Sequence, residues 1–235
     1  MVKYDLSHLT QNDNQNVWGP IQDDEALFLY SIIRGCRMSR ILEVGGLSGY
    51  SGQNFLAALN YPGNNGILYT CDLNPVPKLA NNHKLIIKNA LHITSGELDN
   101  KPLDMVFFDC HDIVQMDIYH RFRNENIIDD NTVIALHDTN LHYAPWNKWG
   151  PFVESKNGYA HQPVERVMTD LFKDMGYDIF SISTDVSKHS DAFPIRHGVT
   201  ICKKIKKFND NIIKGEVTVR HHESLKLTNG RFSLK

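Results

Sequence analysis

Acidic and histidine side chains follow two apolar runs of this chain, where they could move a proton. The run at residues 104–108 ends in Asp109 and His111, and a second apolar run ends in His137 and Asp138. Histidine titrates near neutral pH, so it can accept the proton of a substrate hydroxyl. We therefore predict that His111 or His137 is a general base and that Asp138 acts beside them in catalysis.

A glycine-rich turn supplies a second kind of site. Gly45, Gly46 and Gly49 lie between a predicted strand at residues 40–44 and a predicted helix at about residues 50–59. Glycine lets the backbone approach a ligand where a Cβ would clash. The first turn of the helix presents free N–H groups. The turn is therefore predicted to bind a ligand.

Glu43, at the end of the predicted strand, limits the kind of ligand that the turn can bind. A carboxylate there would repel the phosphates of a dinucleotide and suits a ligand with an amine as well as an anion, such as S-adenosylmethionine. The G-x-G-x-x-G spacing of dinucleotide-binding enzymes is absent, because Gly45 and Gly49 are four residues apart with no third glycine in register. A dinucleotide-dependent oxidoreductase remains the less favoured alternative.

Alternating strands and helices must position these residues. Each candidate strand is a short, nearly continuous apolar run, as in a sheet covered on both faces. The strand candidates are residues 40–44, 67–71, 84–88, 104–108, 132–136, 177–184 and 198–203, with helical segments near residues 22–34, 50–59, 113–128 and 161–175. This order predicts an α/β fold.

The spacing E-x-G-x-x-x-G-Y-S over residues 43–51 resembles motif I of class I S-adenosylmethionine-dependent methyltransferases. It is closest to the catechol and caffeoyl-CoA type and to the macrocin-type group, whose H-D-T ending is similar to residues 137–139. The resemblance spans about residues 20–204. It implies a Rossmann-like doubly wound sheet, mostly parallel with an antiparallel last strand, and methyl transfer to a small-molecule acceptor at a hydroxyl oxygen. A non-catalytic S-adenosylmethionine-binding protein on the same fold is the alternative.

The resemblance also implies which residues hold the cofactor. Asp72 ends the second strand, and its carboxylate can accept both hydrogen bonds of a ribose diol. Asn89 and Ala90 end the third strand and would face the adenine. The full predicted set is Glu43, Gly45, Gly46, Gly49, Ser51, Asp72, Asn89, Ala90, Asp109 and His111.

A divalent cation is a further expectation. Asp109 and Asp138 would lie side by side at neighbouring strand ends, and two close carboxylates either raise one pKa or recruit a cation. In the catechol type an aspartate and an asparagine at the fifth strand end are metal ligands, and Asn140 is the corresponding candidate here. Oxygen ligands favour Mg²⁺ or a similar hard cation over zinc. A site without metal stays equally open.

Two segments could contact the acceptor. Residues 140–160 are rich in aromatic side chains without a clear period, and Trp146 and Trp149 would suit a flat or sugar-like molecule. Arg196 could hold an acceptor's carboxylate. These three residues are the predicted substrate contacts.

The composition limits the classes of partner that the protein is expected to bind. The chain has 235 residues and a net charge of −2, so no global field attracts nucleic acid or a membrane surface. Four cysteines without a C-x-x-C pair, and a polar start without a signal-peptide core, predict a cytoplasmic protein.

The chain divides into two predicted parts. Residues 1–205 would form the methyltransferase domain with a helical lead-in, and residues 206–235 would form an extension. Alternation around Asn229 and Gly230 predicts a β-hairpin in that extension. A lone hairpin is marginal in water, so we expect it to pack on the core or on a second subunit of a homodimer.

Overall fold

The structure is a computed structural model that describes residues 21, 23–111, 114–139, 152–155, 158–161, 164–182, 198–204, 225–228 and 231–234. The chain separates into two compact units, Met1–Ile205 and Lys206–Lys235. In the second unit, β10 (Leu225–Thr228) pairs antiparallel with β11 (Arg231–Leu234), which is the predicted hairpin. The docking of that hairpin and the homodimer stay predictions.

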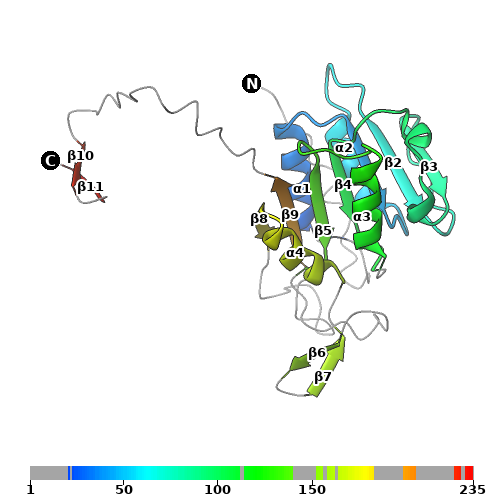
Figure 1. The fold of residues 1–235 in the computed structure, drawn as a ribbon. Helices are drawn as coiled ribbons and strands as arrows, with labels where there is room; N and C mark the ends of the chain where they lie inside the picture. Colours follow the sequence, from blue (N-terminus) through cyan, green and yellow to red (C-terminus); the bar gives the residue numbers. More distant parts are fainter. Residues whose placement is uncertain are drawn as a thin grey trace. The chain divides into compact units, whose positions relative to one another are not determined.

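Seven strands of the first unit form one sheet in the order β3-β2-β1-β4-β5-β9-β8 (Figure 1). They are β1 (Arg40–Val44), β2 (Ile67–Asp72), β3 (His83–Ile87), β4 (Met105–Phe108), β5 (Val133–His137), β8 (Tyr177–Ile182) and β9 (Val199–Lys204). The first five run parallel, and β9 runs antiparallel to both of its neighbours. The predicted mostly parallel sheet with an antiparallel last strand is confirmed.

Helices cover both faces of this sheet. They are α1 (Asp23–Gly35), α2 (Tyr50–Leu59), α3 (Gln115–Asn124) and α4 (Val164–Asp174), with short 3₁₀ turns at Ala90–His92 and Ser95–Leu98. Successive strand residues point to opposite faces. Ile41 and Phe107 therefore pack with α1 and α2, and Leu42 and Phe108 with α3 and α4. No helix among the described residues combines the length and apolar character needed to cross a membrane.

A separate antiparallel pair, β6 (Phe152–Ser155) and β7 (Gly158–His161), overlaps residues 140–160, the aromatic-rich segment in which no clear period was found. The period-2 pattern of so short a pair is too weak to detect among closely spaced aromatic residues. The expectation of a segment without a clear period was therefore wrong for seven of these positions, and the eighth, His161, was predicted to begin the helix that starts at Val164.

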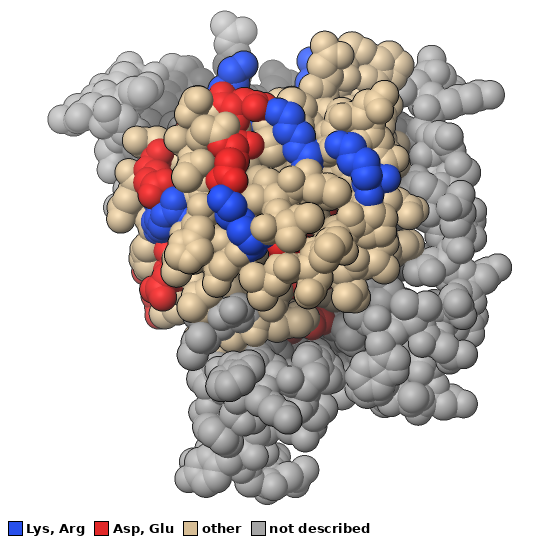
Figure 2. All heavy atoms as spheres, turned by 90° about the vertical axis from the view of Figure 1, so that its right-hand side faces the viewer, with Lys and Arg blue, Asp and Glu red and all other residues tan. Residues whose placement is uncertain are grey.

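The β3 edge of the sheet carries paired charges. Lys84 Nζ lies 2.7 Å from Asp99 Oδ2, and Lys88 Nζ lies 2.7 Å from Glu97 Oε1. Figure 2 views this side of the molecule, where positive and negative side chains lie interspersed. Charged side chains on an edge strand oppose pairing with another chain.

Candidate functional site

A cavity of about 290 Å³ lies where β1, β2, β3 and β4 end. It is lined by the glycine turn after β1 and by residues that follow the other three strands. All residues predicted to hold the cofactor line it, except Glu43 and Gly49. The structure thus brings the predicted set to one place, which is the crevice where α/β sheets bind ligands. That these residues bind the cofactor stays a prediction.

The glycine turn is pressed against the end of β4. Gly45 has φ +98°, and a Cβ built on it would lie 2.3 Å from the backbone oxygen of Asp109. Its N–H donates to the carbonyl of Cys71 at 2.9 Å, on the other neighbouring strand. Gly49 also has a positive φ, +79°, immediately before α2. Both positions require conformations that favour glycine.

Asp72 fastens the glycine turn to the end of β2. Its Oδ2 accepts hydrogen bonds from the backbone N–H of Gly46 at 2.9 Å and of Leu47 at 3.3 Å. Its Oδ1 accepts from the N–H of Asn74 at 2.9 Å. Carboxylate oxygens have more than one lone pair each, so these bonds leave capacity for a ligand's hydroxyl groups. Asp72 therefore shapes the cavity as well as lining it.

Glu43 lies beneath the cavity. It is fully buried, and it accepts hydrogen bonds from the hydroxyls of Ser51, on α2, and Thr70, on β2, the latter at 2.7 Å. Burial raises the pKa of Glu43 to about 7, although both hydroxyl bonds act in the opposite direction. Glu43 is linked to the cavity through Ser51, which lines it.

A histidine that sequence reasoning missed extends this network. The N–H of Leu79 donates to Nδ1 of His83 at 3.2 Å, so Nδ1 accepts and the neutral ring carries its proton on Nε2. Nε2 lies 2.8 Å from the hydroxyl of Thr70, which in turn donates to Glu43. Burial lowers the pKa of His83 to about 4, in keeping with a neutral ring. Only the pairing of β2 with β3 brings these residues together.

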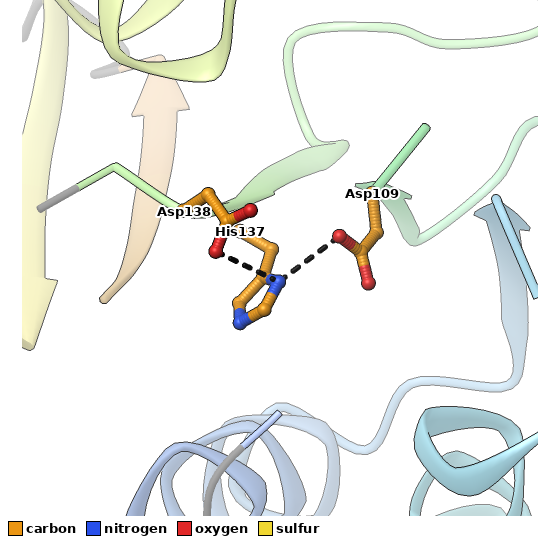
Figure 3. Close-up of side chains that lie close together, drawn as sticks. All are labelled: Asp109, His137 and Asp138. Carbon is orange, nitrogen blue, oxygen red and sulfur yellow. Dashed lines mark hydrogen bonds and ion pairs between the residues drawn. The ribbon is translucent and has the colours of Figure 1, made fainter. Parts of the chain in front are cut away.

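Asp109, His137 and Asp138 form a compact cluster at the ends of β4 and β5 (Figure 3). The imidazole lies between the two carboxylates, with Nδ1 2.9 Å from Oδ1 of Asp109 and 3.5 Å from Oδ1 of Asp138. Burial raises the pKa of Asp109, while His137 and His111 oppose this change. One ligand atom from each of the three residues can be chosen so that all lie within 4.8 Å of one another. This donor set fits a metal ion, with a nitrogen that the predicted oxygen-only set did not include.

His137 faces α1 and is buried behind Asp109 rather than lining the cavity. Its side chain is 1% exposed, and Nε2 lies 3.4 Å from Oε2 of Glu25, whose other oxygen accepts from the N–H of Gly198 at 2.7 Å. Burial acts to lower the pKa of His137, but the charges of Asp109 and Asp138 outweigh it and raise the pKa well above its usual value. Of the two predicted bases, His137 is the one that does not line the cavity.

His111 does line the cavity. Its backbone has φ 52°, which is uncommon for a residue with a side chain. Nε2 lies 3.3 Å from Oδ2 of Asp138 and 3.6 Å from Oδ1 of Asp109, and Nδ1 lies 3.1 Å from Oε1 of Glu165. Burial acts to lower the pKa of His111, but its bond to Glu165 and the three negative charges raise it to about 10.

Glu25 and Glu165 were missed as parts of the site. Neither was predicted to have a functional role, because acidic residues are common in a first helical turn, where they complement the helix dipole. Both are buried, at 1% and 0% exposure. The sequence did contain a signal of their burial. Helical spacing puts Glu25 on the same face of α1 as Leu29, and Glu165 on the same face of α4 as Phe172, and both faces are buried.

Four predicted residues lie outside the described part of the chain. They are Asn140, the third predicted metal ligand, and Trp146, Trp149 and Arg196, the predicted substrate contacts. Their roles stay predictions.

The strand order, with its antiparallel β9 and a cavity at the ends of the first strands, is the Rossmann-like fold of class I methyltransferases. No protein-family model and no curated protein matches the sequence. Solved structures do match. A methyltransferase of Podospora anserina, crystallised with S-adenosylhomocysteine, has a TM-score of 0.56 at 15% identity, over 88% of this chain and 89% of its own.

Two further structures are similar over comparable lengths. The O-methyltransferase TomG of Streptomyces achromogenes, in complex with S-adenosylmethionine, has a TM-score of 0.55 at 20% identity, over 88% of this chain and 92% of its own. A putative caffeoyl-CoA O-methyltransferase of Staphylococcus aureus has a TM-score of 0.54 at 18% identity, over 86% of this chain and 100% of its own. At these identities the likeness establishes the fold, which is the one that the resemblance implied.

Proposed function

We propose that this protein is an S-adenosylmethionine-dependent methyltransferase that transfers a methyl group to a hydroxyl oxygen of a small molecule. The observation that carries the proposal is the cavity at the ends of β1 to β4, lined by the residues that motif I and the strand ends predicted. The names of the similar structures support it, because they describe methyltransferases bound to S-adenosylmethionine or S-adenosylhomocysteine.

Each end of the cofactor has a group that suits it. The carboxylate of Asp72 would accept the ribose hydroxyls. Asn89 and Ala90, which line the cavity after β3, would face the adenine. The backbone N–H groups of Ser51 and its neighbours in the N-terminal turn of α2 would receive the methionine carboxylate, and Asp109 its ammonium group.

Methyl transfer needs alignment and one proton acceptor. The acceptor oxygen attacks the methyl carbon, the carbon–sulfur bond breaks, and a methyl ether, S-adenosylhomocysteine and a proton result. Of the two predicted bases, His111 is the one that lines the cavity, and it would receive that proton, because its Nε2 lies beside Asp109. A sulfonium cation bound nearby would lower the pKa of the His111 ring and so favour its neutral form.

The carboxylates of Asp109 and Asp138 would hold a divalent cation, if the enzyme uses one. Such a cation would supply Lewis acidity for the acceptor hydroxyl. The imidazole nitrogen in the cluster makes Mn²⁺ or Zn²⁺ as compatible as Mg²⁺.

Calorimetric titration with S-adenosylhomocysteine tests the proposal, with and without Mg²⁺ after chelation. We expect micromolar binding, and heat that depends on the metal would place a cation at Asp109 and Asp138. Asp72→Ala should weaken binding about tenfold or more, because hydrogen bonds to a charged group are lost. Asp130→Ala, which removes an exposed carboxylate paired with Arg123, is the matched control and should bind normally.

Each failure has a distinct meaning. If the natural protein does not bind S-adenosylhomocysteine in either condition, the methyltransferase proposal is wrong and only the fold remains. If Asp72→Ala binds as tightly as the natural protein, the ribose assignment is wrong. A protein that binds the cofactor but methylates no acceptor in a broad screen would instead support the non-catalytic alternative.

A further inference from the structure

Glu165 gathers three donors on one oxygen. Its Oε1 lies 3.0 Å from the backbone N of His111, 3.1 Å from Nδ1 of the same residue and 2.6 Å from Nε2 of Gln115. Glu165 and Gln115 are both fully buried. Glu165 is the second residue of α4. His111 lies in the connection after β4, and Gln115 is the first residue of α3. One carboxylate thus links three segments that are far apart in the sequence.

The partners of Oε1 determine the direction of each bond. A backbone N–H can only donate, so Oε1 acts as an acceptor toward His111. The imidazole bond has the same direction when the carboxylate is ionised, which places a hydrogen on Nδ1. The other ring nitrogen, Nε2, is then held toward Asp138 and Asp109 at 3.3 and 3.6 Å.

The backbone of His111 supports this account. A φ of 52° is costly for a residue with a side chain and persists only where surrounding contacts hold it. The bond from the His111 N–H to Glu165 is such a contact, and it acts on the backbone while the Nδ1 bond acts on the ring. Two bonds from one residue to one oxygen fix both the path of the chain and the plane of the imidazole.

We propose that Glu165 is a positioning residue, which orients His111 so that Nε2 faces the methyl-transfer site. The role of this orientation in methyl transfer rests on the proposed function. The orientation itself can be tested without cofactor. Glu165 does not line the cavity and acts only through His111.

Nuclear magnetic resonance of the nitrogen-15-labelled full chain tests the orientation directly. The ring signals of His111 are identified by their loss in His111→Gln. In the natural protein we expect a hydrogen on Nδ1 that exchanges slowly with water. In Glu165→Gln, which keeps the size of the side chain but removes its charge, the ring signals should shift and the amide of His111 should exchange about tenfold faster or more.

Thr169→Val is the matched control. Thr169 lies one turn further along the buried face of α4, and its hydroxyl donates to the backbone carbonyl of Glu165 at 2.9 Å, not to the carboxylate that holds His111. This variant disturbs the same helix, so unchanged His111 signals in it would separate positioning from general packing. Equal shifts in both variants would overturn the proposal.

The remaining outcomes also support or overturn the positioning role of Glu165. Unchanged His111 signals in folded Glu165→Gln would overturn the proposal. If that variant does not fold, the natural protein decides alone, because a His111 ring without a hydrogen on Nδ1 contradicts the geometry. Titration with S-adenosylhomocysteine on the same samples keeps the two proposals apart, since failed binding removes the methyltransferase function and leaves the orientation result standing.

Discussion

In the variant Glu43→Gln, the free energy of unfolding should fall less with rising pH than in the natural protein. Glu43 is fully buried, and its pKa is raised from 4.5 to about 7 chiefly by burial. Between these two values the unfolded chain loses the Glu43 proton and the folded chain keeps it. The free energy of unfolding therefore falls as pH rises through this window, and the loss is complete above the folded pKa.

The size of the effect follows from the two pKa values. At about 1.4 kcal/mol for each pKa unit, the ionised carboxylate costs the folded state roughly 3 kcal/mol. Most of that cost, roughly 2–3 kcal/mol, accumulates between about pH 5 and pH 8. Glutamine fits the same space and cannot ionise, so the variant escapes this cost. Its stability relative to the natural protein should rise by that amount over the same range.

Urea unfolding at a series of pH values measures the difference. All other titrating groups are common to both proteins and cancel to first order when the two curves are subtracted. Glu125→Gln is the control, because Glu125 is exposed and pairs with Arg121 on the surface. A difference between Glu43→Gln and the natural protein that stays constant within about 0.5 kcal/mol from pH 5 to pH 8 would refute the reasoning.

Two further predictions concern the ends of β1 and β5. Gly45→Ala should destabilise the protein by about 2 kcal/mol or more and weaken S-adenosylhomocysteine binding, because the new Cβ meets the Asp109 carbonyl at 2.3 Å. In thermal unfolding, Gly63→Ala is the control, since it has a similar φ of +84° and no atom within 4 Å; equal losses would mean that the clash is relieved. Asp138→Ala should lower turnover at least 100-fold in a labelled-methyl assay, with less change in cofactor affinity, and normal turnover would remove the β5 end from the mechanism.

The sequence predicted those parts of the fold whose signals are local. The strands at 40–44 and 104–108 are dense apolar runs, and the structure has strands there, within one residue of the predicted bounds. Gly45 and Gly49 marked the turn because their backbone conformations favour one residue type. The order of acidic residues along the strand ends predicted which side chains would meet, because parallel strands end at one edge of a sheet.

The supporting residues could not be predicted in the same way. His83 begins an edge strand and reaches Thr70 only because β3 pairs with β2 in one register. Helical spacing puts Glu25 and Glu165 on apolar helix faces, but a carboxylate in a first helical turn is commonly exposed, and tertiary packing decides that these two are buried. The same packing separates the two histidines, because His137 shares the α1 face with Ala135.

The electrostatics of the site also bear on the kind of ligand. Four carboxylates, from Glu25, Asp109, Asp138 and Glu165, surround two imidazoles within the described part of the chain. Of these carboxylates, Asp109 lines the cavity. A positively charged group bound beside Asp109 would interact favourably with its ionised carboxylate. The sulfonium and ammonium groups of S-adenosylmethionine, or a divalent cation, are such groups, whereas the pyrophosphate of a dinucleotide would be repelled.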